Sequence, residues 1–362
     1  MRSNLPLLVL FCIIALNAPA QKEESPSLNI GDPAPALWVH EWLKGTPTPQ
    51  FEKGRVYVVE FWATWCGPCI ESMPHLTALA TQYKDQVTVI GIDILEKKTT
   101  PMQKIRAFVT GMGSKMNYCV GLQEGDSMQT NWLYASGEQA IPCAFIVDRQ
   151  ARLAWIGTPF DLDEPLKQVV NQTIDLGKAS ARRKEMKRLE SLDQAAMETL
   201  YNYAAIAEKQ DSIPFVINEL VQKEPNLKYA PVIASYTFLS LLKTDPHKAY
   251  EYGKQVLVTS TYTDPAYGSI IGAMDWYGDK LSLPTEIYTL AAEACQAEID
   301  RYPLSKKSFK FYHKMAGWYF CSGNKEKAIE AEQKAIDDIK TGVWGRQADV
   351  STYEAILQQY KN

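Results

Sequence analysis

The sequence predicts an α/β fold, a mixed sheet with helices on both faces, followed by a second part that is entirely helical. As far as residue 176, short runs of β-branched and aromatic residues alternate with segments whose apolar residues recur at helical spacing. From Gly177 onward only the helical spacing remains. Because the chain has 362 residues, more than one typical domain, two folded domains are expected.

The first part consists of strand and helix patterns in alternation. The run 56–63 has the β-branched, aromatic and small residues of a buried strand, and apolar residues at helical spacing follow it from Ile70 to Ala80. The last two strands would form a hairpin, which fits a mixed sheet. Further strands are expected at 87–94, 117–122, 144–148 and 153–157, and further helices at 101–109, 128–135 and 163–176.

Two cysteines lie where the first buried strand gives way to its helix. Cys66 and Cys69 are separated by Gly67 and Pro68, and a proline can open a helix. The free N–H groups and the positive dipole end at a helix N-terminus stabilise a thiolate on Cys66. Cys69, one turn further on, is placed to resolve a mixed disulfide. A metal site is disfavoured because there is no second such pair and the four histidines are scattered.

The stretch 60–69, Glu-Phe-Trp-Ala-Thr-Trp-Cys-Gly-Pro-Cys, resembles the active-site segment of thioredoxin-fold proteins. With Gly-Asp-Pro-Ala-Pro at 31–35 and Ile141-Pro142 downstream, it resembles the TlpA/ResA-like disulfide reductases of bacterial envelopes, within the redoxin family. The similarity covers residues 28–175. It implies a thioredoxin-like domain that acts as a thiol-disulfide oxidoreductase through a redox-active disulfide in this motif.

The resemblance also implies roles for residues around the two cysteines. Pro142 matches a proline that is cis in the family and leaves a backbone edge free for substrate; an ordinary trans turn proline is the alternative. Glu60 matches a buried acid that could take a proton from Cys69, because desolvation raises the pKa of a carboxyl. An edge-strand Glu reaching solvent is the alternative. Trp65 would form an apolar platform beside the thiol, and Trp62 is expected to pack in the core.

The other cysteines are expected to be free. Cys143 directly follows the proline, and strand alternation points it away from the active site. It is read as a small core residue, with a third redox thiol as the sharper alternative. Cys295 and Cys321 would be offset along antiparallel helices, so no bridge between them is expected.

Residues 1–20 have the features of a cleaved signal peptide. Arg2 is followed by the uncharged run 5–16 and by Ala-Pro-Ala at 18–20. The apolar run is too short to span a bilayer. The mature protein would begin at Gln21 as a soluble, exported protein, most simply in a Gram-negative periplasm. The formal net charge of −4 argues against a nucleic-acid partner.

The thioredoxin-like domain is expected at 21–176, a basic linker helix at 177–192 and an α-helical domain at 193–362. The linker is read as a solvated face, with a docking stripe for an acidic partner or a membrane surface as the alternative. Residues 323–336 resemble the second helix of a tetratricopeptide repeat, so the helical domain is read as TPR-like. Helices are expected at 194–209, 212–223, 227–243, 246–259, 265–277, 285–301, 306–322, 325–340 and 347–360.

Three functions fit this pattern. The leading one is an exported reductase that acts on disulfide-containing proteins and is recharged by an envelope electron donor, presumed to be a membrane reductase. The second is a disulfide isomerase or oxidase whose helical domain holds clients. The third is a partner-binding helical adaptor with a redox-sensitive lid. None of them implies a metal or an organic cofactor.

Overall fold

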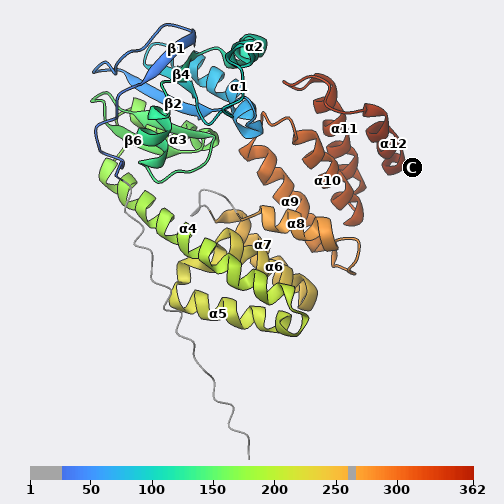
Figure 1. Ribbon diagram of the computed structural model, residues 1–362. Coiled ribbons are helices and arrows are strands. Elements are labelled where there is room, and N and C mark those ends of the chain that lie inside the picture. Colours follow the sequence, from blue (N-terminus) through green and yellow to red (C-terminus); the bar gives the residue numbers. More distant parts are fainter. Residues whose placement is uncertain (1–26, 260–265) are drawn as a thin grey trace, which may run out of the picture.

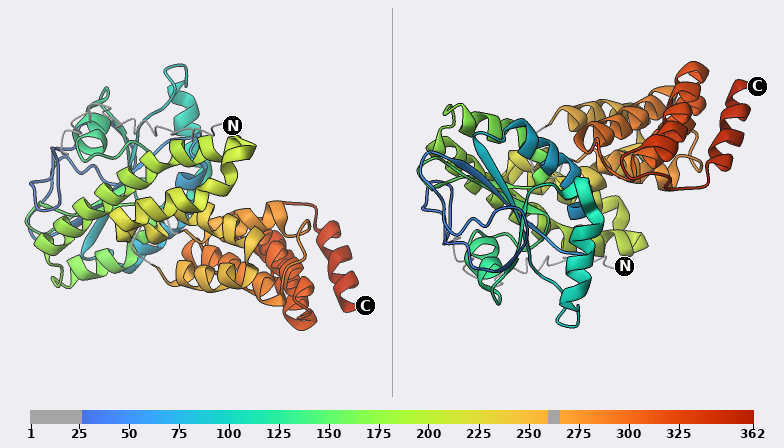
Figure 2. Two further views of the ribbon diagram at one scale, coloured as in Figure 1. Left: turned by 90° about the horizontal axis from the view of Figure 1, so that it is seen from below. Right: turned by 90° about the horizontal axis from the view of Figure 1, so that it is seen from above.

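The computed structural model describes residues 27–259 and 266–362, so the signal peptide expected at 1–20 lies outside the described residues. The chain forms a sheet-containing part and a helical part that lie beside each other (Figure 1). The long helix α4 (Leu176–Ala205) begins against the sheet part and runs into the helical part, and the left view of Figure 2 shows this connection.

The sheet has six strands in the order β1-β4-β3-β2-β5-β6. Strands β2, β3 and β4 are parallel neighbours, whereas β1, β5 and β6 pair antiparallel, so the sheet is mixed as predicted. Every residue of the central strand β2 is buried, which its apolar composition requires. The strands are β1 (Val39–Lys44), β2 (Val56–Trp62), β3 (Val87–Asp93), β4 (Cys119–Gln123), β5 (Cys143–Val147) and β6 (Leu153–Gly157).

Two apolar layers enclose the sheet. Helices α1 (Gly67–Gln82), α2 (Met102–Met112) and α3 (Asp163–Val170) supply side chains to the core on one face, where Cys66 and Cys69 also lie. The chain before β1, the π-helical turn Gln129–Tyr134 and the start of α4 cover the other face. The reactive pair therefore belongs to the face that α1, α2 and α3 share.

Three elements differ from the sequence prediction. Strand β1 was not predicted, because it is an edge strand whose residues are only partly buried and include charged ones. The helix expected at 163–176 ends at Val170, and Gln172 beyond it has a φ of 58°. The helices expected at 177–192 and 194–209 are one 30-residue helix, α4.

The break expected near Asp193 is absent. The Asp193 carboxylate instead accepts the N–H groups of Val232 and Ile233, at 2.9 and 3.1 Å, at the start of helix α6 (Pro231–Thr244). Among the residues described, the helical part contains nine α-helices, and no described helix is long and apolar enough to cross a membrane. After α4 they are α5 (Ile213–Lys223), α6 (Pro231–Thr244), α7 (Pro246–Val258), α8 (Gly268–Tyr277), α9 (Thr285–Arg301), α10 (Ser308–Cys321), α11 (Lys325–Thr341) and α12 (Val350–Lys361).

The helical part returns to the sheet part through the loop between α9 and α10, which lies beside α1 (Figure 1). Arg301 binds Asp161 with both terminal guanidinium nitrogens, each 2.9 Å from a carboxylate oxygen. Ser305 donates a hydrogen bond of 2.9 Å to Glu71, a buried residue of the active-site helix. The helical part is therefore fixed to the active-site helix as well as to α4.

Helix α4 is held on the sheet part by Arg183, whose guanidinium donates to the Ser136 carbonyl at 2.8 Å and to Glu138 at 2.6 Å. Arg183 is 8% exposed, so Arg183→Met leaves the Ser136 carbonyl without this donor and leaves Glu138 paired only with Lys187, 2.9 Å away. We expect the free energy of unfolding to fall by about 2–4 kcal/mol in urea denaturation. The exposed neighbour Lys184, replaced by Met, should change it by less than about 0.5 kcal/mol. Equal effects of the two substitutions would contradict this account of the junction.

Candidate active site

Cys66 is the N-cap of α1 and carries the sulfur that faces the helix amides. Its backbone is extended, with φ −81° and ψ 99°, and its Sγ accepts the N–H of Cys69 at 3.2 Å. Gly67 and Pro68 occupy the first turn, where a proline leaves no intrahelical donor unpaired. A cap sulfur in this position is stabilised as a thiolate by the amide and by the helix dipole.

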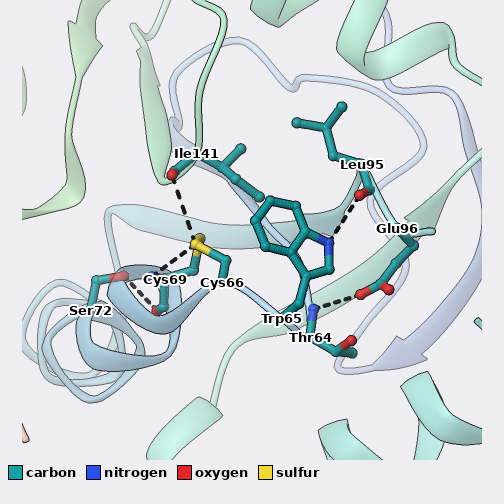
Figure 3. Close-up of a disulfide and its surroundings, with 8 residues drawn as sticks. All are labelled: Thr64, Trp65, Cys66, Cys69, Ser72, Leu95, Glu96 and Ile141. Carbon is teal, nitrogen blue, oxygen red and sulfur yellow. Dashed lines mark hydrogen bonds between the residues drawn. A yellow bond between two sulfur atoms is a disulfide. The ribbon is translucent and has the colours of Figure 1, made fainter.

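Cys66 and Cys69 are joined by a disulfide (Figure 3). Their exposed fractions are 3% and 0%, so Cys66 is the more accessible sulfur of the pair. Ser72 lies one turn below and donates to the Cys69 carbonyl at 2.8 Å. The sequence predicted this division, with Cys66 outermost and Cys69 one turn inside the helix. Cys119, Cys143, Cys295 and Cys321 are free thiols, as expected.

The segment before β5 closes one side of the site. The Ile141–Pro142 peptide bond is cis, the geometry that the resemblance implied. The carbonyl oxygen of Ile141 lies 3.8 Å from the Cys66 sulfur, so this backbone edge faces the reactive atom (Figure 3). Pro142 is the next residue along this edge, and its role toward a substrate stays a prediction.

A loop after β3 closes the opposite side. Trp65 is 54% exposed, and its indole N–H donates to the Leu95 carbonyl at 3.0 Å (Figure 3). Leu95 has a φ of 57°, a left-handed conformation that is uncommon for residues other than glycine. Glu96 accepts the N–H of Thr64 at 2.6 Å. This loop therefore fixes the exposed ring next to Cys66.

Residues two apart in a strand point to the same face, so Glu60 shares its face of β2 with Val58 and Trp62. Those two residues belong to the core that contains the two cysteines, so Glu60 lies on the same side of the sheet as the cysteines. Its side chain is fully buried, and within the described residues neither carboxylate oxygen has a hydrogen-bond partner. Burial, and secondarily the charge of Asp93, raises the pKa of Glu60 well above its ordinary value. The predicted buried acid is present, and the solvent-exposed edge-strand alternative is wrong.

Trp62 and Cys143 behave as core residues. Trp62 is fully buried and stacks on Phe108 with ring centroids 5.4 Å apart. Cys143 packs on the opposite face of the sheet, in the core that includes Phe145 and Trp132. Burial raises the pKa of the Cys143 thiol, which disfavours a thiolate there. The site brings Cys66, Cys69, Trp65 and Pro142 together and excludes Cys143.

Sequence reasoning missed Asp93, Glu96 and Tyr118. Asp93 is 4% exposed, and burial, followed by the charge of Glu96, raises its pKa to about 8. Tyr118 is 7% exposed, and its pKa is raised by burial and by the charge of Glu60. One signal was available for Asp93, a charged residue at the end of an otherwise apolar strand. Nothing in the local pattern identifies Tyr118.

The arrangement is suited to thiol-disulfide exchange, since a capped outer sulfur, an inner sulfur and a buried acid lie on one side of the sheet. Within 27–259 and 266–362, no three histidine, cysteine, aspartate or glutamate side chains lie close enough to hold a metal ion.

Comparison with known proteins agrees with this chemistry. Residues 50–128 match the family model described as Thioredoxin. The chain is 34% identical over 149 residues to Protein FixW of Rhizobium leguminosarum, covering 40% of this chain and 67% of FixW. It is 28% identical over 172 residues to the thiol:disulfide interchange protein HelX of Rhodobacter capsulatus, covering 46% of this chain and 91% of HelX.

A third relative is the thiol-disulfide oxidoreductase ResA of Bacillus thuringiensis, 28% identical over 136 residues, with 37% of this chain and 70% of ResA covered. All three alignments cover less than half of this chain, which leaves room for the helical part outside them. The chain therefore belongs to the thioredoxin family, as a TlpA/ResA-like thiol-disulfide oxidoreductase domain with an additional helical region at its C-terminal side.

Proposed function

We propose that this thiol-disulfide oxidoreductase is an exported protein-disulfide reductase that works through the Cys66–Cys69 dithiol. The observation that carries the proposal is the sulfur of Cys66 at the N-terminus of α1, with the Cys69 N–H 3.2 Å away. That amide and the helix dipole favour the thiolate, which is the attacking form in exchange. The thiol:disulfide interchange named in the HelX relative supports a protein disulfide as the substrate.

The reaction transfers two electrons from the dithiol to the substrate. The Cys66 thiolate attacks one sulfur of the substrate disulfide, and the other substrate sulfur leaves and takes up a proton. The Cys69 thiol then gives its proton to Glu60 and attacks Cys66. This second attack closes the Cys66–Cys69 disulfide and releases the second substrate thiol.

The residues around the pair have supporting roles in this proposal. Glu60 acts as the proton acceptor, because it is buried on the same face as Cys69. Pro142 presents the backbone edge along which an extended substrate segment pairs, next to the Ile141 carbonyl that faces Cys66. Trp65 provides an exposed apolar surface beside the attacking sulfur.

Direction and location follow from the sequence features. The Gly-Pro dipeptide between the cysteines is the one that reducing thioredoxins carry. Export through the signal peptide at 1–20 places the protein in an oxidising compartment, where an envelope electron donor, such as a membrane reductase, must recharge it. We assign residues 21–176 to the exchange domain and 193–362 to a TPR-like domain that binds a protein partner, with 177–192 between them.

The two cysteines should be separable by mutation. Cys69→Ser keeps the attacking thiolate but cannot resolve the mixed disulfide, so we expect the protein to accumulate covalently bound to chains of disulfide-intact insulin or of another disulfide substrate. Cys66→Ser should form no adduct and should reduce nothing. Non-reducing electrophoresis after acid quenching detects the adduct. Adducts of equal yield in both variants would show that Cys66 is not the attacking sulfur.

Glu60→Gln preserves the size of the side chain but removes its ability to accept a proton. We expect closure of the Cys66–Cys69 disulfide near neutral pH to slow by roughly 100-fold, measured by stopped-flow tryptophan fluorescence. The alkylation rate of Cys66, which does not need this proton transfer, should stay within about twofold. Equal closure rates in the variant and the wild type would rule out Glu60 as the acceptor.

The stability of the same variant shows whether its fold is intact. Because the pKa of Glu60 is raised above the ordinary 4.5, its contribution to the free energy of unfolding is fully present below pH 4.5 and is lost as pH rises through the folded-state pKa. Glu60→Gln lacks this loss. We therefore expect denaturant unfolding of the variant to depend less on pH above 4.5 than that of the wild type.

A further inference from the structure

Polar groups converge in the core beneath the dithiol. Glu60 pairs with Gly91 across β2 and β3, and Trp62 pairs with Asp93, so all four lie on one face. A Cβ built on Gly91 would lie 2.9 Å from the Tyr118 ring, 3.2 Å from a Glu60 carboxylate oxygen and 3.3 Å from the Trp62 indole nitrogen. A side chain at position 91 would therefore meet a ring carbon of Tyr118 and polar atoms of Glu60 and Trp62, so the glycine lets these three side chains converge.

These groups are buried without protein partners. Within the described chain, no hydrogen bond reaches the two Glu60 oxygens, Asp93 Oδ2, the Trp62 indole nitrogen or the Tyr118 hydroxyl. An unpaired buried polar atom is costly, and such atoms are normally satisfied by ordered water. Ordered water is therefore the partner that would satisfy these atoms. Such water would connect the side chains of this cluster by hydrogen bonds where they do not contact one another directly.

The acids of this region form a row from the core to the surface. Glu60 lies in the central strand, Asp93 ends the neighbouring strand, and Glu96 follows in the half-buried loop. Their pKa values are coupled in the same order: after burial, the charge of Asp93 raises that of Glu60, and the charge of Glu96 raises that of Asp93. Glu96 also binds the N–H of Thr64, two residues before Cys66.

We propose that Asp93 is a positioning residue for the exchange reaction, which together with Glu96 and bound water carries the proton of Glu60 between the core and solvent. The inference rests on the role of Glu60 in the proposed function and deepens it. When the disulfide closes, the proton leaves the Cys69 thiol for Glu60, passes through water to Asp93, and leaves by Glu96 to solvent. No electron moves along this row.

A route of this kind is needed because Glu60 cannot exchange its proton directly. It is fully buried, so a proton that it takes from Cys69 has no direct path to solvent, and Glu60 must release that proton before it can accept another. The titratable groups of this region lie in β2, in β3, in the loop after β3 and just before β4. The charge of Asp93 raises the pKa of Glu60, the charge of Glu96 raises the pKa of Asp93, and the charge of Glu60 raises the pKa of Tyr118. Asp93 is the acid that lies between the core and the loop.

The test is the reaction of the reduced, full-length protein with glutathione disulfide, followed by stopped-flow fluorescence between about pH 5 and pH 9. For Asp93→Asn we expect closure of the Cys66–Cys69 disulfide to slow by about tenfold at neutral pH, because the exit of the proton becomes limiting. We also expect the inflection of the pH profile to move to lower pH, since Glu60 loses a neighbouring negative charge. A merely structural role for Asp93 would not move this inflection.

Asp193→Asn is the matched control, because Asp193 is also 4% exposed but lies in the helical part, and asparagine can still accept the amides of α6. It should keep the wild-type rate and pH profile. A second variant, Glu96→Gln, removes the outer acid at a half-buried position and should slow closure in the same way. Closure by Asp93→Asn and Glu96→Gln within about twofold of the wild type at every pH would overturn the proposal.

The experiment separates this inference from the proposed function. Glutathione disulfide is a small reagent, so closure can be measured whatever the cellular client and whatever the direction of electron flow. If the wild type fails to reduce insulin, the reductase proposal fails, yet the comparison of pH profiles still supports or overturns the proton route. If the wild type reduces insulin and the profiles coincide, only the proton route fails.

Discussion

The hydrogen bond between the Cys69 N–H and the Cys66 sulfur is the interaction on which the site depends. It makes one atom both the N-cap of α1 and the attacking group, so the stability of the helix end and the ionisation of the thiol are linked. Strand β2 delivers the chain to that cap, and the Ile141 carbonyl and the exposed Trp65 ring border it on two sides. The apolar layer under α1 in turn keeps Glu60 fully buried, which raises the pKa of its carboxyl.

The sequence predicted those features of the site that depend on residues close together along the chain. The strand–Cys66–helix junction and the burial of Glu60 follow from local pattern, since alternation and helical spacing act over a few residues. Strand β1 was missed because it is an edge strand whose charged residues read equally well as loop. Asp93 lay inside a predicted strand, and only its contribution to the site was missed. The contact between Glu71 and Ser305 joins residues 234 positions apart, and no local pattern encodes such a pairing.

Because of the Glu71–Ser305 contact, the helical part is attached to the sheet part by more than a linker. A helical domain attached only by a linker would move freely, but here α4 is anchored by Arg183 and the α9–α10 loop rests on the active-site helix. Phe160 and Tyr302 add an edge-to-face ring contact with centroids 4.5 Å apart, next to the Arg301–Asp161 ion pair. A protein bound by the helices would therefore be held at a fixed distance from the dithiol, which suits a reductase with a dedicated client as well as an isomerase that retains its client.

The reduction potential of the Cys66–Cys69 couple decides between these directions most directly. It is measured by equilibrating the full-length protein in glutathione or dithiothreitol redox buffers and quantifying the free thiols. A reductase whose dithiol is an effective electron donor should have a potential near about −270 mV, the value of thioredoxin. A potential near about −180 mV or above would contradict the reductase and indicate an isomerase or oxidase.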